Sequence, residues 1–191
     1  MRTKTLVVTN SPANLEGRYG TRVDAFERVV RINKGFCENR WPENLGQKTE
    51  VWGICGCCVL LDESSLLKGA LHPQWGAVKT IVVANHHASR TVGEERLELL
   101  RKTKEVITFE APQCRQWAAD IHCKGVTTAF SLIRHFLAVD GEVTCLGIWP
   151  DVVPMHPLYT DKNGKQPHLG QLAREREFLL NQKGIFHLEK E

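Results

Sequence analysis

The sequence predicts an α/β fold in which helices cover both faces of a mainly parallel central sheet. Short β-branched runs alternate along the chain with amphipathic, helix-like segments, which is the pattern of a parallel sheet flanked by helices. The run IVVA within residues 79–84 is continuously apolar, as expected for a strand that is buried on both faces. The first two strand-like runs, residues 5–9 and 28–33, each lead into an asparagine at their carboxyl end.

The β-branched runs place the expected strands, and the apolar periodicity with capping residues places the helices. The segment 93–102 begins with acidic and ends with basic residues, which complements a helix dipole. Thr127 or Thr128 can cap the helix that follows it. Strands are expected at residues 5–9, 28–33, 50–54, 79–84, 105–109, 142–147 and 185–188. Helices are expected at residues 60–71, 93–102, 127–139 and around Glu175 and Glu177, and a loop is expected around Gly17 and Gly20.

Length and composition point to one domain spanning residues 1–191, with enough chain to bury a sizeable core. The net charge of +3 is too small to support nucleic-acid binding, although it suits an anionic nucleotide. No apolar stretch has the length of a secretory signal core or a membrane span. The seven cysteines are an odd number in clustered positions, which favours a reducing compartment. We therefore expect a soluble, cytoplasmic protein.

Polar residues follow the first two expected strands directly. Asn10 and Ser11 follow the first strand, and Asn33 ends the second. Ligands of open α/β sheets bind outside the carboxyl ends of the strands. A carboxamide both donates and accepts hydrogen bonds, which suits a phosphate, a ribose or the edge of a pyrimidine.

These residues belong to a longer pattern. Residues 10–24 read N-S-x-x-N-L-x-G-x-x-G-x-x-V-D, and V-V-R-I-N and L-G-x-K-T follow by residue 49. In this order the pattern resembles the long motif of the sialyltransferase family, glycosyltransferase family 29, in a short soluble member of bacterial or viral type. The resemblance implies a Rossmann-like domain of the GT-A-like sialyltransferase variant. Eukaryotic members have a bridged cysteine near the head of the first strand, where this chain has Lys4 and Thr5.

A second stretch is similar to the family's short motif, in which S/T-T-G opens a helix and the next strand ends in Y-G-F. Here Thr127, Thr128 and Ala129 are followed by LGIWP at residues 146–150. The resemblance implies that this turn and Trp149 contact the nucleotide part of a CMP-sugar. Ala129 stands where the family has glycine, which indicates either a shifted pocket or a different donor. Taken alone, the stretch also fits an ordinary capped helix and strand.

The segment after the short motif resembles the family's third and last motifs. His156 matches the histidine of H-Y-[aromatic]-D, with Tyr159 and Asp161 displaced by one or two positions. His168 matches the histidine of H-x4-E, and Glu175 follows it by seven residues rather than five. Participation of Tyr159 in nucleotide binding is expected, whereas that of Asp161 and Glu175 stays open.

The resemblance implies transfer of a sialic acid, Kdo or a related acidic sugar from CMP to a glycan hydroxyl with inversion. His168 would take the hydroxyl proton, because an imidazole titrates near neutral pH. His156 or Tyr159 would stabilise the departing phosphate. The chain contains no Asp-x-Asp, and a donor with one phosphate has less charge to neutralise, so we expect no metal and no other cofactor.

Two other hypotheses for the function of the protein stay open. The altered spacing, Ala129 and the absent cysteine are also compatible with an inactive nucleotide- or glycan-binding protein of the same fold. A dinucleotide-dependent oxidoreductase is less favoured, because no G-x-G-x-x-G follows a strand.

Overall fold

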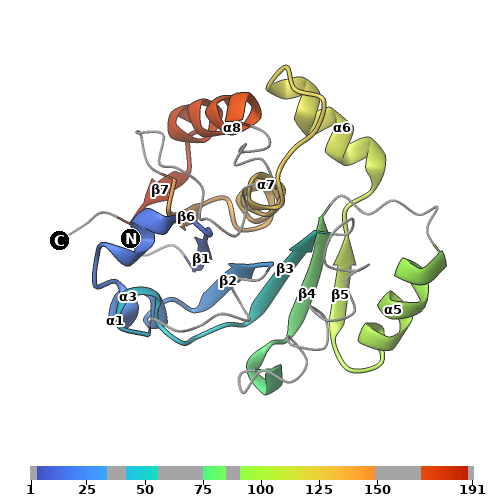
Figure 1. Ribbon diagram of the computed structural model, residues 1–191, viewed down its shortest axis with the longest axis horizontal. Helices are drawn as coiled ribbons and strands as arrows, with labels where there is room; N and C mark the ends of the chain where they lie inside the picture. The colour runs from blue at the N-terminus through green and yellow to red at the C-terminus, as the bar shows by residue number, and fades with distance from the viewer. Residues whose placement is uncertain (1–3, 34–41, 56–74, 85–90, 149–168, 189–191) are drawn as a thin grey trace, which may run out of the picture.

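The computed structural model describes residues 4–33, 42–55, 75–84, 91–148 and 169–188. In these residues seven strands form one sheet in the order β5-β4-β3-β2-β1-β6-β7, and every neighbouring pair is parallel (Figure 1). The expected sheet is therefore confirmed, and it is parallel throughout the described residues. The strands are β1 (Thr5–Val8), β2 (Arg28–Ile32), β3 (Val51–Cys55), β4 (Thr80–Ala84), β5 (Glu105–Thr108), β6 (Val143–Leu146) and β7 (Ile185–His187).

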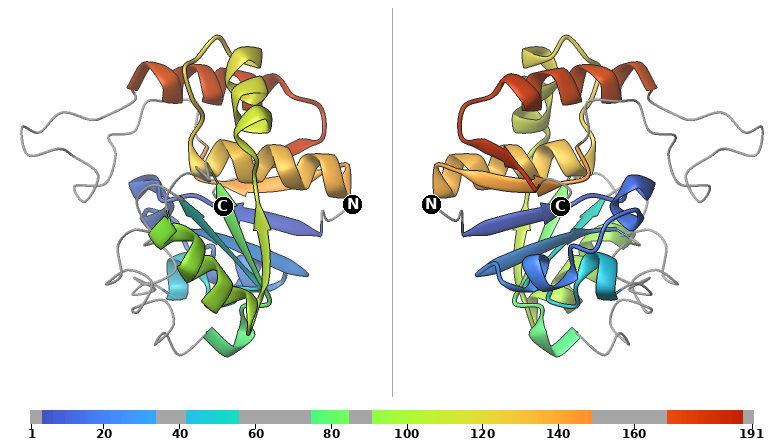
Figure 2. Two further views of the ribbon diagram at one scale, coloured as in Figure 1. Left: turned by 90° about the vertical axis from the view of Figure 1, so that its right-hand side faces the viewer. Right: turned by 90° about the vertical axis from the view of Figure 1, so that its left-hand side faces the viewer.

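Helices cover both faces of the sheet (Figure 2). Helices α6, α7 and α8 lie on one face, and α1, α3 and α5 lie on the other. The α-helices are α1 (Gly20–Asp24), α3 (Pro42–Leu45), α5 (Thr91–Arg101), α6 (Ala111–Asp120), α7 (Thr128–Asp140) and α8 (Leu169–Asn181). Two 3₁₀ turns, η1 (Pro12–Leu15) and η2 (Trp75–Ala77), complete the described elements. None of the helices in the described residues has the length and apolar character needed to cross a membrane.

All seven expected strands are confirmed to within about two residues at each end. The helices expected at 93–102 and 127–139, and the one carrying Glu175, are also confirmed. The helix expected at 60–71 lies outside the described residues. The prediction of a loop around Gly17 and Gly20 is wrong at Gly20, because Gly20 is the first residue of α1. Helix α6 was not expected, because no side-chain cap marks its start and only three of its ten residues are buried.

Helix α7 packs tightly across the middle of the sheet. Leu132, Ile133 and Phe136 form an apolar stripe along the helix and are buried in the core cluster on this face. A Cβ at Gly53 of β3 would overlap the side chain of Leu132, so the glycine permits this close approach. Complete burial of a single large aliphatic side chain contributes about 1.5–3 kcal/mol. The hydrophobic stripe thus fixes how α7 sits on the sheet.

The carboxyl end of α7 is tied to the amino edge of the sheet. Asp140, the last residue of α7, accepts hydrogen bonds from Thr5 Oγ1 at 2.6 Å and Arg28 Nη1 at 2.8 Å. The Arg28 guanidinium also lies 5.4 Å from the centre of the Phe136 ring. Thr5 and Arg28 open β1 and β2. Because α7 runs back along the sheet from this anchor, its first residues lie toward the carboxyl edge.

Candidate functional site

The carboxyl ends of β1 and β6 are the point at which the chain connections of the sheet diverge. From β1 the chain passes to β2 on one side, whereas from β6 it leads to β7 on the other. The Thr9 N–H donates to the Leu146 carbonyl at 2.9 Å, so the two strands stay paired to their ends. Ligands of open α/β sheets bind at such a point, since the loops separate there.

Side chains extend the hydrogen-bond pattern of the sheet beyond the end of β1. Thr9 Oγ1 donates to the Gly147 carbonyl and Asn10 Nδ2 donates to the Ile32 carbonyl, both at 3.1 Å. Asn14, which is buried, donates from Nδ2 to the Thr9 carbonyl at 2.7 Å. The residues after β1 are thereby fixed to the ends of both neighbouring strands. Asn10 therefore has a structural role, because its side chain connects the segment after β1 to the end of β2.

Asn33 joins the ends of β2 and β3 in a similar way. Its backbone adopts a φ of 48°, a left-handed conformation that asparagine tolerates better than most residues. Its N–H donates to the Gly53 carbonyl at 2.7 Å, and its own carbonyl accepts from Trp52 Nε1 at 2.9 Å. Asn33 Oδ1 accepts from the Cys55 N–H at 2.8 Å. The Nδ2 amino group is thus the part of the side chain that can donate to a phosphate or carbonyl oxygen.

A buried arginine connects the V-V-R-I-N and L-G-x-K-T parts of the long motif. Arg31 is 2% exposed and donates to four oxygens between the last residue of α3 and Thr49. Nε contacts Thr49 Oγ1 at 2.9 Å and the Lys48 carbonyl at 3.2 Å, whereas Nη2 contacts the Leu45 and Gly46 carbonyls at 2.7 and 2.9 Å. Burial lowers the pKa of Arg31 to about 10, so it stays charged at neutral pH. Only arginine offers so many donors in one planar group.

The first part of the long motif holds the same segment from the other side. Asp24 Oδ1 accepts from the Gln47 and Lys48 N–H groups, each at 2.8 Å. A Cβ at Gly20 would overlap the Pro42 carbonyl, so α1 and α3 approach each other closely at that glycine. Much of the long motif therefore forms a scaffold behind the asparagines at the edge of the sheet.

The start of α7 has the features of a well-formed helix cap. Thr127 is the N-cap residue, with an extended backbone, and its Oγ1 accepts from the Phe130 N–H at 3.2 Å. Thr128 and Ala129 are the next residues, and their N–H groups lack acceptors within the helix because of its geometry. Such groups, together with the helix dipole, favour an anion. The start of α7 can therefore take part in binding an anion at this edge.

Glu175 of α8 contacts this turn directly. Its side chain is 3% exposed, and its carboxylate accepts from the Thr127 N–H and the Thr127 hydroxyl, both at 2.6 Å. Gln171, one turn earlier in α8, donates to Glu175 Oε1 at 2.9 Å. The sequence left the role of Glu175 open. The sequence did contain a signal for this contact, because Leu172, Glu175 and Leu179 lie on one face of the helix. A charged side chain on an apolar face that packs on the core requires hydrogen-bond partners there.

The predicted site residues divide into two groups. Asn10, Ser11 and Asn33 lie at the ends of β1 and β2, and Thr127, Thr128 and Ala129 form the start of α7. His156, His168, Trp149, Tyr159 and Asp161 lie outside the described residues. Contact of any of these residues with a nucleotide stays a prediction.

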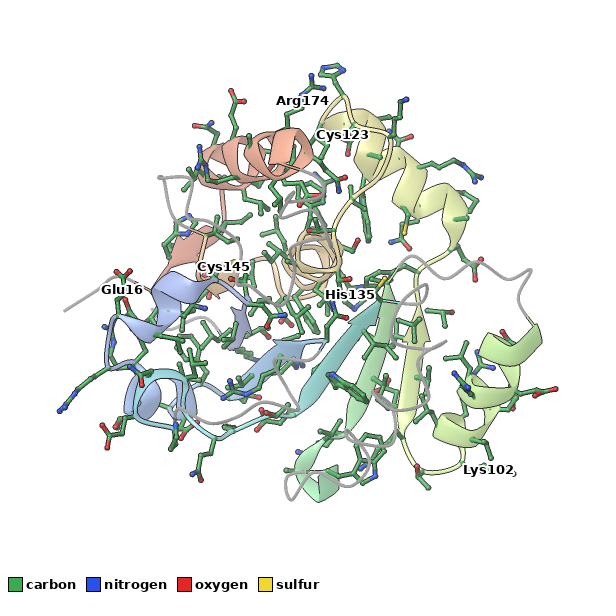
Figure 3. All side chains as sticks on the ribbon, viewed as in Figure 1. Glu16, Lys102, Cys123, His135, Cys145 and Arg174 are labelled. Atoms are coloured by element: carbon green, nitrogen blue, oxygen red, sulfur yellow. The ribbon has the colours of Figure 1, made fainter. Side chains whose placement is uncertain are left out.

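In the described part of the chain, no group of three or more histidine, cysteine, aspartate or glutamate side chains is placed so that it could hold a metal ion. His135, labelled in Figure 3, lies on α7 with its ring centre 5.1 Å from that of Phe109. Burial lowers its pKa, and this effect outweighs the nearby Asp140 carboxylate. His135 is therefore a packing residue.

No protein-family model and no curated protein sequence matches the chain. Solved structures do match. A mammalian sialyltransferase in complex with Gal-beta-1-3GalNAc-ortho-nitrophenol superposes with a TM-score of 0.64 and 15% sequence identity, covering 98% of this chain and 69% of that one. A second mammalian sialyltransferase structure has the same TM-score and identity, covering 99% and 70% of the two chains.

A point mutant of the alpha-2,3/8-sialyltransferase CstII is a more distant match. It has a TM-score of 0.54 and 17% identity, covering 97% of this chain and 81% of that one. The chain thus has the Rossmann-like fold of the sialyltransferases, over nearly all of its length.

Proposed function

We propose that the protein is a glycosyltransferase that moves a sialic acid or a related acidic sugar from CMP to a glycan hydroxyl. The observation that carries this proposal is the arrangement at the carboxyl edge within a sialyltransferase fold. Asn10 and Asn33 end neighbouring strands, and α7 begins toward the same edge. The order of the four motifs along the chain adds support.

In this proposal the nucleotide lies across the ends of β1 and β2. The Asn33 amino group donates to an oxygen of the CMP, and Asn10 and Ser11 line the same edge. The N–H groups of Thr128 and Ala129 donate to the phosphate oxygens at the start of α7. Ala129 is partly buried and packs against the core cluster. Replacement of the family's glycine is therefore compatible with a donor at this turn.

The proposed reaction transfers the sugar in one displacement. The acceptor oxygen forms a bond to the sugar carbon from the side opposite the phosphate, while the bond from that carbon to the phosphate oxygen breaks. His168 takes the acceptor proton as a general base. His156 or Tyr159 stabilises the negative charge that develops on the phosphate oxygen. CMP carries one phosphate, and the proposed mechanism assigns the stabilisation of its charge to protein groups rather than to a metal.

Calorimetric titration of the purified protein with CMP, UDP and GDP, with and without EDTA, tests the donor class. We expect micromolar CMP binding that EDTA does not change, followed by turnover of a CMP-sugar. His168→Ala should retain CMP binding and lose about 10²–10⁴-fold in turnover. His122→Ala is the matched control, because His122 is exposed on the loop after α6.

Each contrary result has a distinct meaning. Binding of UDP or GDP in place of CMP contradicts the donor class. CMP binding without transfer or donor hydrolysis supports the inactive binding protein, which is the alternative. Unchanged turnover in His168→Ala removes His168 from the mechanism.

A further inference from the structure

The Glu175 carboxyl group accepts three hydrogen bonds at the start of α7, which favours its ionised form. Three donors from two helices converge on it: the Thr127 N–H, the Thr127 hydroxyl and Gln171 Nε2. Burial of a charge at 3% exposure is costly unless its hydrogen bonds are made. The two shortest of these bonds, 2.6 Å each, go to the single residue that begins the turn.

The carboxylate also determines the direction of the Thr127 hydroxyl. An ionised carboxylate can only accept, so the hydroxyl proton must point toward Glu175. The oxygen lone pairs of Thr127 are then available to the Phe130 N–H, which they cap at 3.2 Å. The Thr127 carbonyl accepts from Ser131 Oγ at 3.0 Å. Every polar group of Thr127 is thus engaged in fixing the first turn of α7.

We propose that Glu175 is a positioning residue for the donor phosphate. It acts through Thr127 and makes no contact with the donor itself. By fixing Thr127, Glu175 keeps the N–H groups of Thr128 and Ala129 pointing toward the bound phosphate. This inference rests on the proposed function, in which that turn receives the phosphate of CMP.

Two opposing effects operate when Glu175 is replaced by glutamine. Loss of the negative charge lowers the repulsion of an incoming phosphate, which would strengthen binding. A carboxamide, however, has one acceptor oxygen, and an NH₂ group in place of Oε2 makes the Thr127 hydroxyl turn and accept instead of donate. The charge-assisted hydrogen bonds that fix the turn are then lost. The three hydrogen bonds already disperse the carboxylate charge, so we expect the loss of positioning to dominate.

The test compares the affinities of CMP and cytidine for the same variant. Cytidine lacks the phosphate, so contacts to the base and ribose cancel in the ratio of the two dissociation constants. We expect Glu175→Gln to reduce the preference for CMP over cytidine on the order of tenfold, as is typical when a hydrogen bond involving a charged group is lost. Glu177→Gln is the control, since it makes the same chemical change at an exposed position of α8 and should keep the preference.

The outcomes separate positioning from support of the fold alone. A purely structural role lowers the melting temperature but leaves the preference for CMP unchanged in the folded fraction. An unchanged or increased preference in Glu175→Gln therefore overturns the inference. If that variant does not fold, Thr127→Val provides the same comparison by deleting the hydroxyl. Thr127→Ser restores the hydroxyl and should recover most of the preference.

Failure of the proposed function gives a different result. A wild-type protein that shows no preference for CMP over cytidine contradicts phosphate binding at this turn, and both proposals fall together. A wild-type preference that persists in Glu175→Gln and Thr127→Val contradicts only the role of Glu175.

Discussion

Replacement of Gly147 by alanine should be considerably more destabilising than the same replacement at Gly141. Both glycines have positive φ, 96° at Gly147 and 77° at Gly141. An alanine in such a conformation costs about 1–2 kcal/mol at either position. A Cβ at Gly141 meets nothing within 4 Å, whereas a Cβ at Gly147 overlaps Thr9 Oγ1 and the Asn14 amide. Forcing those two side chains to move adds about 1–3 kcal/mol at Gly147 alone.

Urea unfolding and thermal melting of the two variants measure this difference. For a chain of this size, about 1 kcal/mol corresponds to about 2–4 °C in melting temperature. We expect Gly141→Ala to lose about 4 °C and Gly147→Ala about 10 °C. Because Thr9 and Asn14 fix the end of β1, Gly147→Ala should also weaken CMP binding, whereas Gly141→Ala should not. Equal losses of stability would refute the reasoning, since the backbone cost would then explain both variants.

Two further replacements test buried polar groups. Arg31→Lys should lower the free energy of unfolding by about 2–4 kcal/mol, since a single ammonium cannot reach all four oxygens. Urea unfolding measures this loss. Arg18→Lys is the control, because Arg18 is exposed. Burial lowers the pKa of His135 in the folded protein. The imidazole therefore binds a proton more readily in the unfolded chain, and the folded protein loses stability as the pH falls below about 6.5, the ordinary histidine pKa. His135→Gln should therefore lose less stability than the wild type between about pH 7.5 and about pH 5 in urea titrations; parallel losses would exclude a contribution from His135.

Most strands of the sheet could be predicted from the sequence because they are short, rich in β-branched residues and buried on both faces. Thr80–Ala84 is the clearest example, with four of its five residues buried. Helix α6 was missed, because Glu110 precedes it without a side-chain cap and few of its residues are buried. Cys114, Trp117 and Ala118 are its buried residues. Their spacing carried a helical signal, but three positions in a ten-residue segment are a weak pattern.

The location of the candidate site could be predicted from the sequence more fully than the hydrogen bonds that its residues make. Asparagines after two strands indicate an edge, and the structure confirms that Asn10 and Asn33 end neighbouring strands. The sequence does not reveal that both side chains also bond to adjacent strands. The contact between Glu175 and Thr127 joins residues 48 positions apart. Local patterns contain no information on such pairs, because tertiary packing alone brings them together.

The position of β1 between β2 and β6 has a consequence for how the protein forms. During synthesis, β1 to β5 can pair as they emerge, but one edge of β1 must wait for β6, near the other end of the chain. Pairings so distant in sequence are slow and are made late in folding. The proposed donor site spans that seam and also needs α8, so an incomplete chain would carry only half of it. Nucleotide affinity would then report on completed folding, and CMP would stabilise only the finished protein.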